Sequence, residues 1–314
     1  MQTIMNHYAL AVDLGATNVR VGLVSPAGKI VAKIKDKTPK NGKNGAVVSH
    51  RIIGMIREIM TGYPDTRIMG IGISSIGPLD YKAGGPLHSP NIPFQFVPLE
   101  EPLRKKFSLP VFLLNDANAA VLAEQRFGAG KNKKNLVYIT ISTGIGGGAI
   151  VDGKLLLGKS GNAAEVGHMI ADTAYSIRCS CKKGLGHWEG YASGRNIPKF
   201  FKVWAKAHGK KIAVMLPAAK DVFDSARSSN AVAREFLDVL HRVNARAISN
   251  IIVAYDPEII TIGGSVMLMN GPVLLAGIKK YVDRYLKLPE IRVTRLGDDI
   301  ALLGAAAAVF AQRE

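Results

Sequence analysis

Apolar and polar residues follow two patterns along the chain, and together these predict strands that alternate with helices. Short apolar runs bounded by glycine, proline or polar clusters are typical of buried strands, whereas apolar residues three or four positions apart are typical of amphipathic helices. Strands are predicted at residues 8–14, 19–24, 29–33, 68–73, 111–114 and 258–262, with a strand-turn-strand unit at 135–151. Helices are predicted at residues 46–60, 116–127, 196–208, 230–255 and 301–312. This alternation indicates an α/β fold.

A glycine-bearing turn directly follows an apolar strand at three places: residues 13–17 (DLGAT), residues 142–148 (STGIGGG), and Gly263 with Gly264. We expect the whole of 142–148 to form the turn of its strand pair. Because glycine has no Cβ, the backbone N–H groups of such turns can approach a phosphate closely. The residues predicted to seat a nucleotide in this way are Gly15, Thr17, Thr143, Gly144, Gly263 and Gly264. The carboxylate of Asp13, at the end of its strand, is suited to hold a Mg²⁺-bound water.

Two familiar nucleotide-binding patterns are missing from the chain. The GxxxxGK[ST] pattern does not occur, and GxGxxG does not occur at the first strand. An ordinary P-loop or dinucleotide-binding fold is therefore disfavoured.

The recurrence of the strand and glycine turn predicts two similar halves. No clear linker separates them, so we expect a hinge within residues 115–130. We assign residues 1–118 to an N-terminal α/β domain and residues 119–299 to a C-terminal α/β domain, and we expect the helix at 300–314 to pack back on the first. The irregular stretch at 74–98 is rich in glycine, proline and serine and is a candidate substrate loop, because long loops in compact domains are usually functional or mobile.

Composition narrows the class of protein. With 314 residues, 47% of them hydrophobic and 21% charged, the chain can form about two globular cores, which excludes a disordered tail protein. No apolar run reaches the roughly 18 residues of a membrane span, and the N-terminus carries no secretory signal pattern, so we expect a cytoplasmic protein without a membrane partner. The two cysteines, Cys179 and Cys181, cannot form a disulfide framework.

The formal net charge is +17. Such an excess is compatible with a nucleic-acid partner, with solubility, or with attraction of anionic ligands. The basic residues are scattered, and their short clusters lack the interleaved aromatic residues of a single-strand binding groove. We therefore predict no nucleic-acid partner and interpret the charge as solvated surface that also favours an anionic substrate.

Asp116 is the candidate catalytic residue. Asn115 and Asp116 stand at the end of the predicted strand 111–114, the usual position for chemistry in an open α/β sheet. Phosphoryl transfer to a hydroxyl group requires a carboxylate within hydrogen-bond reach of the attacking oxygen, so Asp116 is predicted to be the general base. The alternative is that Asp116 only caps the helix that follows.

Several segments, taken in order, resemble the ROK family of sugar kinases and repressors over nearly the whole chain. They are residues 13–17, 72–80 (GISSIGPLD), 89–91 (SPN), 115–119 (NDANA), 142–148 and 161–168 (GNAAEVGH). The segments 186–189 (GHWE) and 193–198 (SGRNIP) resemble the archaeal branch most closely. The resemblance implies two actin-like, ribonuclease H-like α/β domains with a cleft for nucleotide and sugar between them.

The resemblance also implies roles for individual residues. Asp116 would take the proton of the sugar 6-hydroxyl, and the substrate-binding residues would be Ser75, Gly77, Asn91, Asn115, Asp116, Glu165, His168 and Glu189. Asn18 would join Asp13 and the glycine turns in binding the nucleotide. Carboxylates and an amide suit this task because they can hold neighbouring hydroxyl groups by two hydrogen bonds.

The implied activity is an ATP-dependent sugar kinase that uses Mg²⁺ and phosphorylates the 6-hydroxyl of an aldohexose, with glucose as first choice. N-acetylmannosamine or N-acetylglucosamine remains an alternative substrate, since nothing in the sequence separates them. A sugar-responsive DNA-binding regulator is the more remote alternative, because Asp13 comes too early to leave room for a helix-turn-helix ahead of it. A homodimer is expected, since dimers are the commonest assembly.

Many ROK members hold zinc through a histidine and three cysteines, and this chain departs from that pattern. It has His168, Cys179 and Cys181, but the third cysteine is missing and residues 182–187 are one position longer than the family spacing. His187 is a candidate replacement, because imidazole is a competent zinc ligand and a tetrahedron of two cysteines and two histidines is feasible. The alternative is two ordinary thiols beside a tryptophan.

Overall fold

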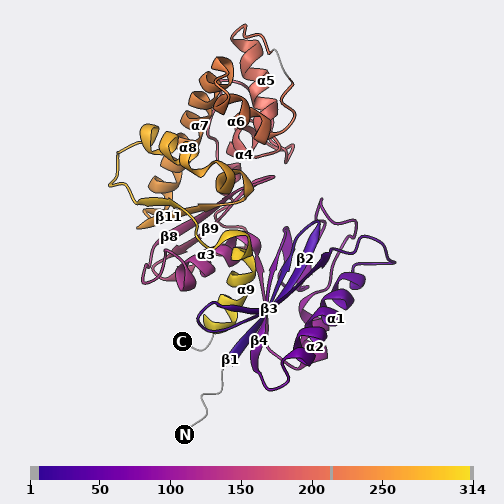
Figure 1. Cartoon of the computed structure of the whole chain (residues 1–314). Helices are drawn as coiled ribbons and strands as arrows, with labels where there is room; N and C mark the ends of the chain where they lie inside the picture. The colour runs from indigo at the N-terminus through magenta and orange to yellow at the C-terminus, as the bar shows by residue number, and fades with distance from the viewer. Residues whose placement is uncertain (1–6, 213–214, 312–314) are drawn as a thin grey trace. The chain divides into compact units, whose positions relative to one another are not determined.

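The computed structural model describes residues 7–212 and 215–311, and these form two compact α/β units (Figure 1). Unit 1 comprises residues 7–131, 157–162 and 298–311, and unit 2 comprises residues 132–156, 163–212 and 215–297. The helix at 116–127 thus lies in unit 1. The domain boundary expected near residue 118 stays a prediction, and the parts of that assignment at residues 1–6 and 312–314 lie outside the described residues.

Unit 1 is built on a five-stranded sheet of order β3-β2-β1-β4-β7. Its strands are β1 (His7–Leu14), β2 (Asn18–Val24), β3 (Ile30–Lys37), β4 (Arg67–Ser75) and β7 (Val111–Asn115). The first three are antiparallel neighbours, whereas β1, β4 and β7 run parallel. Within the segment expected to be irregular, β5 (Leu79–Asp80) and β6 (Gly85–Pro86) form a short separate pair.

Helices cover both faces of this sheet, and the alternation of side chains along β1 decides which residues meet them. Leu10, Val12 and Leu14 lie in one core with Ile52 of α1 (Ala46–Gly62) and Leu103 of α2 (Glu100–Phe107). The opposite face meets α9 (Ile300–Ala311), which packs on β1, on β4 and on α3 (Asp116–Phe127). Gly72 of β4 permits this contact, because a Cβ there would lie 1.8 Å from the carbonyl oxygen of Ala305.

Unit 2 repeats the plan with a five-stranded sheet of order β10-β9-β8-β11-β12. The strands are β8 (Leu136–Ile141), β9 (Ile145–Val151), β10 (Lys154–Leu155), β11 (Ile259–Gly263) and β12 (Glu290–Val293). Here too three antiparallel strands are followed by two that run parallel to the first, β8. The predicted similarity of the two halves is confirmed at the level of sheet topology.

The helices of unit 2 enclose a large aromatic and aliphatic core. They are α4 (Trp188–Ala192), α5 (Ile197–Ala207), α6 (Ala219–Arg227), α7 (Ala231–Tyr255) and α8 (Ser265–Tyr281). Phe200 and Trp204 of α5 pack against Phe236 of α7, with ring centroids 5.1 and 5.5 Å apart. One-turn helices lie at Val166–His168 and Gly297–Asp299.

The predicted helices and strands are present, with differences that have physical causes. β3 continues to Lys37 because its outward positions are lysines, which hide the alternating pattern of an edge strand. α8 is absent from the prediction because Gly271 and Pro272 interrupt its helical signal. Charged α2, short α6 and β12 are also absent from it. The end of the predicted helix at Gln312 lies outside the described residues.

The prediction that the whole segment 142–148 is a turn is wrong. β9 begins at Ile145, so only residues 142–144 form the turn. Gly147 lies within the strand, where a Cβ would come 2.7 Å from Val166 Cγ2 and 2.9 Å from the carbonyl oxygen of Ala164. Glycine is required there by the close approach of another segment.

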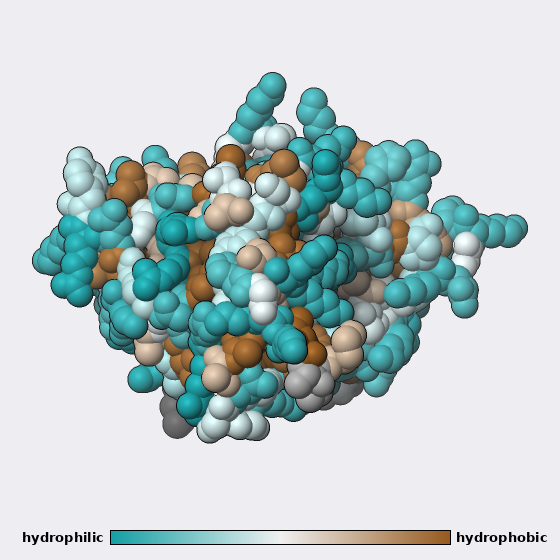
Figure 2. All heavy atoms as spheres, turned by 90° about the horizontal axis from the view of Figure 1, so that it is seen from above, coloured by the Kyte–Doolittle hydropathy of each residue, from teal (hydrophilic) through white to brown (hydrophobic). Residues whose placement is uncertain are grey.

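The surface shows no concentration of large hydrophobic side chains on the face drawn in Figure 2, where hydrophilic residues separate small hydrophobic areas. Single exposed hydrophobic residues of this kind are normal. None of the described helices combines the length and the apolar character needed to cross a bilayer.

Candidate active site

In unit 1 several predicted site residues lie at the edge of the sheet where its parallel strands have their carboxyl ends. β1, β4 and β7 run parallel, and Leu14 is paired with Ser75, which is paired with Asn115. These strands therefore end side by side. The glycine turn leaves β1 at this edge, and α3 leaves β7 there, which is the usual position for a binding site in an open α/β sheet.

The turn between β1 and β2 is a tight hairpin. The Gly15 N–H donates to the Asn18 carbonyl oxygen at 3.0 Å, and Thr38 Oγ1 donates to the Gly15 carbonyl oxygen at 2.8 Å. A Cβ on Gly15 would lie 3.1 Å from that Asn18 oxygen. Thr17 is exposed in the turn, so its hydroxyl group is accessible to a ligand.

Asp13 is almost fully buried at the end of β1. Its Oδ2 accepts a hydrogen bond from Arg20 Nε at 2.8 Å, and Arg20 also reaches Asp299 at 3.2 Å. Lys33 pairs with the same Asp299 at 2.7 Å. Burial raises the pKa of Asp13, and the Arg20 guanidinium opposes this rise. Sequence reasoning missed Arg20, although the hairpin register places it directly opposite Asp13.

Asn115, rather than Asp116, is the residue that caps α3. Asn115 has an extended backbone, and its Oδ1 accepts from the Ala117 N–H at 2.9 Å. Asp116 is the first helical residue, and its Oδ1 accepts from the same N–H at 2.8 Å. The side chains of both residues thus bind the N–H at the start of α3, with Asn115 at the capping position.

Gly77 lies close to Asn115: a Cβ on Gly77 would be 3.3 Å from Asn115 Nδ2. Ser75 is buried at the end of β4, and its hydroxyl donates to the Ile76 carbonyl oxygen at 3.2 Å. Asn91 is exposed in the irregular segment, and no hydrogen bond joins its side chain to these strand ends within the described part of the chain. Ser75, Gly77, Asn115 and Asp116 thus form a group, to which Asn91 is not joined.

In unit 2 the turn at residues 142–144 lies beside the N-terminus of α8. Ser142 Oγ and Ser265 Oγ are 3.0 Å apart. Gly264 precedes α8 with φ +85°, and a Cβ there would lie 2.5 Å from the Ile141 carbonyl oxygen, so the approach of α8 to β8 depends on glycine. The first turn of a helix offers unpaired N–H groups and a favourable dipole to an anion.

A pocket of ≈ 330 Å³ opens beside this turn and helix end. Its lining residues are Ser142, Thr143, Gly194, Arg195, Ala219, Lys220, Ser265, Val266, Met269 and Asn270. Sequence reasoning missed Arg195, Met269 and the other residues outside the glycine turns. The pocket contains two basic side chains and no acidic one, so it is suited to an anionic ligand.

Glu189 connects the glycine turn to a second group of side chains. Its Oε2 accepts from the Ile145 N–H at 3.0 Å, and its Oε1 lies 3.7 Å from Cys179 Sγ. A Cβ on Gly144 would be 2.6 Å from Glu189 Oε2. The turn can therefore approach Glu189 only because residue 144 is glycine.

Glu165 precedes the one-turn helix that follows β10, and His168 is the last residue of that helix. Burial of its carboxyl group raises the pKa of Glu165, His168 opposes the rise, and the like charge of Glu189 adds to it. This segment is tied to β9, because a Cβ on Gly167 would lie 2.1 Å from the Ile145 carbonyl oxygen. Glu165, His168 and Glu189 are thereby held near one strand, as their predicted common role requires.

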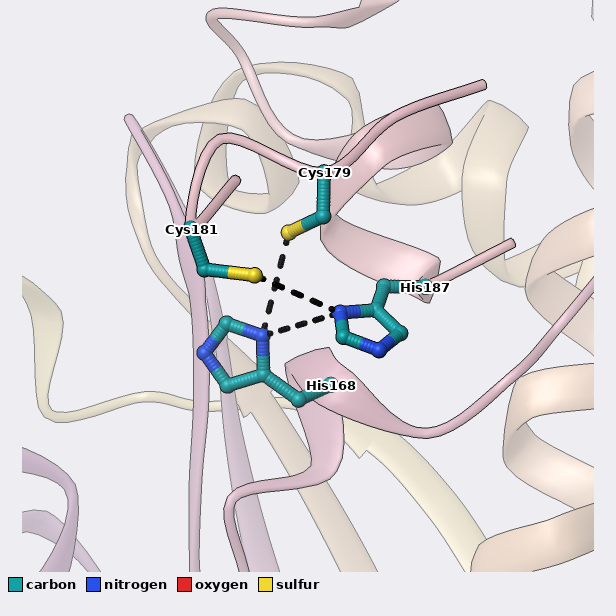
Figure 3. A group of neighbouring side chains, drawn as sticks. All are labelled: His168, Cys179, Cys181 and His187. Carbon is teal, nitrogen blue, oxygen red and sulfur yellow. Dashed lines mark hydrogen bonds between the residues drawn. The ribbon is translucent and has the colours of Figure 1, made fainter. Parts of the chain in front are cut away.

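The four predicted metal ligands point toward one another (Figure 3). One ligand atom from each of His168, Cys179, Cys181 and His187 lies within 4.8 Å of all the others. His168 Nδ1 is 3.4 Å from His187 Nδ1 and 3.8 Å from Cys179 Sγ, and His187 Nδ1 is 3.6 Å from Cys181 Sγ. In a tetrahedral zinc site with bonds of about 2.0–2.3 Å, neighbouring ligand atoms lie about 3.3–3.8 Å apart. The three printed separations agree with this range and all six lie within 4.8 Å, so the four side chains are close to the arrangement that such an ion requires.

The loop between the cysteines and His187 is shaped around the histidine ring. The Cys179 N–H donates to the Gly184 carbonyl oxygen at 3.0 Å, and Arg178 and Leu185 form an isolated bridge. A Cβ on Gly184 would lie 2.2 Å from His187 Nε2. The His187 ring therefore lies directly against residue 184, which has room for it because it is glycine.

Comparison with known proteins finds relatives that match nearly the whole chain. The profile of the ROK family matches residues 9–312. A glucokinase of Pyrobaculum calidifontis is 38% identical over 303 residues, which cover 96% of this chain and 94% of that protein. The crystal structure of a ROK hexokinase from Thermus thermophilus superposes with a TM-score of 0.82 at 29% identity and covers 98% of this chain and 99% of that one.

A second solved structure bears directly on ligands. It is a ROK family glucokinase from Streptomyces griseus in complex with glucose and AMPPNP. It is 30% identical, with a TM-score of 0.73, and the match covers 96% of this chain and 98% of that one. The fold expected from the sequence, with two actin-like α/β halves, is confirmed by these neighbours and by the repeated sheet topology.

Proposed function

The chain belongs to the ROK family, and we propose that it is an ATP-dependent glucokinase, which transfers the γ-phosphoryl group of ATP to the 6-hydroxyl group of glucose. The observation that carries the proposal is the 38% identity to a glucokinase over nearly the full length of both proteins. The neighbour that binds glucose and AMPPNP supports the same substrates.

The nucleotide binds at the glycine turns. In unit 2, Thr143 and Gly144 offer the β8–β9 turn to the phosphates, and Gly263 and Gly264 lead into the N-terminus of α8. The adjacent pocket supports this assignment, because Thr143 and Ser265 are among its lining residues. A nucleoside in that pocket would therefore have its phosphates beside the turn. In unit 1, Gly15, Thr17 and Asn18 offer the corresponding turn.

Asp13 is assigned to Mg²⁺, which neutralises phosphate charge when bound. Mg²⁺ usually keeps several of its water ligands and takes others from the nucleotide phosphates. A single carboxylate at a strand end is therefore sufficient to hold it. Arg20 holds one oxygen of the Asp13 carboxylate and fixes its orientation. Asp13 thus acts through water rather than by contact with the phosphate.

Asp116 acts as the general base. Its carboxylate takes the proton from the sugar 6-hydroxyl as that oxygen attacks the γ-phosphorus. Asn115 and the buried end of β4, with Ser75 and Gly77, hold the sugar at this edge. Asn91, Glu165, His168 and Glu189 are assigned to further sugar hydroxyls on the family resemblance alone.

His168 can serve both the sugar and a zinc ion. Its Nδ1 faces the cluster with Cys179, Cys181 and His187, which leaves Nε2 on the far side of the ring for a sugar hydroxyl. Zinc would supply structural rigidity rather than chemistry, because four protein ligands complete its tetrahedron. The ion would fix the segment that carries Glu165 and the one that carries Glu189.

ADP release in the presence of Mg²⁺ tests the function against a sugar panel. The panel contains glucose, mannose, glucosamine, N-acetylglucosamine and N-acetylmannosamine. We expect glucose to give the highest kcat/KM. A preference for an N-acetylated sugar would identify the enzyme as an N-acetylhexosamine kinase, and salt-dependent DNA binding without ADP release would favour a regulator.

Substitution of the base separates catalysis from binding. Asp116→Asn is expected to lower kcat by at least about 100-fold while glucose binding persists. Asp65→Asn, the same exchange at an exposed position, should keep full activity. Activity of the first variant within about tenfold of the parent, a loss below ~1.4 kcal/mol, would contradict the assignment.

We expect the enzyme to act as a homodimer in the cytoplasm and without a nucleic-acid partner. Size-exclusion chromatography coupled to light scattering measures the molar mass and so the number of chains in the assembly. A monomer that retains full activity would rule out a dimer as the active form.

A further inference from the structure

The carboxylate assigned to Mg²⁺ belongs to a network of four charged side chains in unit 1, Asp13, Arg20, Lys33 and Asp299. Arg20 Nε donates to Asp13 Oδ2 at 2.8 Å, and Arg20 Nη2 lies 2.5 Å from the same oxygen. The third guanidinium nitrogen, Nη1, donates to Asp299 Oδ1 at 3.2 Å. Asp299 Oδ2 in turn accepts from Lys33 Nζ at 2.7 Å. The proposed mechanism assigns no role to Asp299.

Packing, rather than local sequence, brings Asp299 to this network. Along β1, Val12 and Leu14 enter the hydrophobic core, so the Asp13 side chain points to the opposite face of the sheet. That face is covered by α9, which begins at Ile300. Asp299 therefore stands directly before the first residue of α9. The approach of this helix to the sheet determines where the Asp299 carboxylate lies.

Arg20 binds one oxygen of the Asp13 carboxylate and leaves the other. A guanidinium group frequently pairs with both oxygens of a carboxylate, with one N–H on each. Here Nε and Nη2 both approach Oδ2, so Arg20 leaves Oδ1 for another ligand. The Asp13 side chain is 10% exposed and is thus not sealed from solvent. Water bound to Mg²⁺ donates hydrogen bonds, and a carboxylate oxygen of this kind suits it as an acceptor.

Asp299 restrains the guanidinium group that leaves this oxygen. The group is planar and rigid, so contacts at Nε, Nη2 and Nη1 together fix its position and its tilt. The Asp299 carboxylate also attracts part of a positive charge that Asp13 would otherwise face alone. Arg20 and Asp299 are both partly buried, so salt and solvent screen this pair less than an ion pair on the open surface.

We propose that Asp299 is a positioning residue for phosphoryl transfer: it holds Arg20 on one oxygen of Asp13 and so keeps the other oxygen for a magnesium-bound water. Without Asp299, the guanidinium group is free to turn and pair with both oxygens, in competition with the ion. The inference rests on the proposed kinase function and on the assignment of Asp13 to Mg²⁺. It adds to the site a residue 279 positions away from Arg20 in the chain.

Binding of AMPPNP at different concentrations of free Mg²⁺ tests the proposal without sugar and without turnover. Calorimetry gives the dissociation constant in EDTA and at rising Mg²⁺, and Mg²⁺ is expected to tighten binding to the parent protein. Asp299→Ala should raise the Mg²⁺ concentration at the midpoint of this effect about 10- to 100-fold, the usual cost of losing a residue that orients a metal ligand. Its AMPPNP affinity in EDTA should stay within about twofold of the parent.

Asp298→Ala is the matched control. Asp298 directly precedes Asp299, is exposed, and forms no ion pair within the described part of the chain. The control removes the same charge from the neighbouring position and should leave the Mg²⁺ midpoint unchanged. An equal shift of the midpoint in both variants would mean that negative charge near the site, rather than the hold on Arg20, is what matters, and would overturn the proposal.

Asp299→Asn is the second variant. It keeps an oxygen for Arg20 Nη1 but lacks the charge that draws the guanidinium group, so the midpoint should shift in the same direction by a smaller factor. Thermal melts show whether each variant is folded, and Asp299→Asn decides the question if Asp299→Ala is not. An unchanged midpoint in every folded Asp299 variant would overturn the proposal.

This inference and the proposed function fail in different ways. If glucose is phosphorylated but the midpoint does not move in the Asp299 variants, the function stands and the role of Asp299 is wrong. If no sugar is phosphorylated but the midpoint shifts as expected, the kinase function is wrong and the role of Asp299 toward the metal stands. If the AMPPNP affinity of Asp299→Ala falls as much in EDTA as in Mg²⁺, Asp299 supports the fold and the inference is wrong.

Discussion

Gly144 is a residue whose role depends on one neighbour. It leaves room for Glu189, which is bound to the adjacent Ile145 N–H and faces Cys179 on its other side. The Glu189 carboxylate thus contacts both the glycine turn and the group of cysteines and histidines. At this scale, one contact sets both the shape of the turn and the position of Glu189, which we propose binds the sugar.

Gly144→Ala is expected to lower kcat/KM by about 100-fold, because the new Cβ must displace Glu189 or the turn by roughly 1 Å. Steady-state kinetics together with a thermal melt measure the effect, and the melting temperature should change little. Gly62→Ala is the matched control, since a Cβ there meets nothing within 4 Å. Near-normal kinetics in the first variant would mean that Glu189 can move without loss.

Arg20→Met is expected to destabilise unit 1 in a pH-dependent way. Burial raises the pKa of Asp13 and Arg20 opposes the rise, so removal of Arg20 raises that pKa further. At pH 7.5 a buried, unpaired carboxylate should cost about 2–4 kcal/mol of the free energy of unfolding. The loss should shrink as the pH falls toward the raised pKa, because the folded protein then takes up the proton.

Denaturant unfolding at pH 7.5 and at pH 5 measures this difference. Arg57→Met, on the exposed face of α1, serves as the control and should change stability little at either pH. Equal losses at both pH values in Arg20→Met would show that the charge of Asp13 is not what Arg20 balances.

At the scale of helices, strands and loops, the segment that carries Cys179, Cys181 and His187 is a loop without a regular helix or strand. Isolated bridges and a hydrogen bond from Trp188 Nε1 to Asn244 Oδ1 at 2.7 Å hold it, and four potential ligand atoms converge beside it. Loops of this kind depend on a few contacts for their order. A bound ion would therefore stabilise the loop more than it would stabilise the sheet.

Purified protein is expected to contain about one zinc per chain, and Cys181→Ser or His187→Ala should lower the content severely. Chelation should reduce glucose affinity, because His168 would lose its fixed orientation. Elemental analysis and glucose titration measure both effects. His50→Ala, an exposed histidine of α1, should keep the parental metal content. Protein that is metal-free and fully active would contradict the site.

At the scale of the whole molecule, the chain builds two hydrophobic cores, one in each unit. Ile52 belongs to the core of unit 1 and Phe236 to the core of unit 2. Both side chains are fully buried. Stability within each unit therefore depends mainly on its own core, because each sheet is covered by helices of the same unit.

Phe236→Ala is expected to lower stability by about 3–5 kcal/mol and Ile52→Ala by about 2–5 kcal/mol. Hydrogen exchange followed by mass spectrometry should place the faster exchange mainly in unit 2 for the first variant and in unit 1 for the second. Val203→Ala, at an exposed position of α5, should change neither. Uniform acceleration across both units would mean that they unfold as one.

The sequence by itself determined the parts that depend on local physics. Apolar periodicity located β1, α1, α3 and α7 within a few residues, and the glycine requirement marked the turns at Gly15 and Gly144. The order of motifs also predicted the family, because the spacing of strand ends and turns is a property of the chain itself. Each motif lies within a few neighbouring residues, and their order is fixed by the chain.

Only the tertiary structure decided which side chains meet. The hydrogen bond from Ile145 to Glu189, the lining of the pocket by Met269, and the pairing of Arg20 with Asp299 join residues far apart in the chain. No local period encodes them, and Gly271 and Pro272 concealed the helix that carries Met269. Such contacts arise when helices and loops pack against a sheet, since packing places side chains at distances that neighbouring residues alone do not determine.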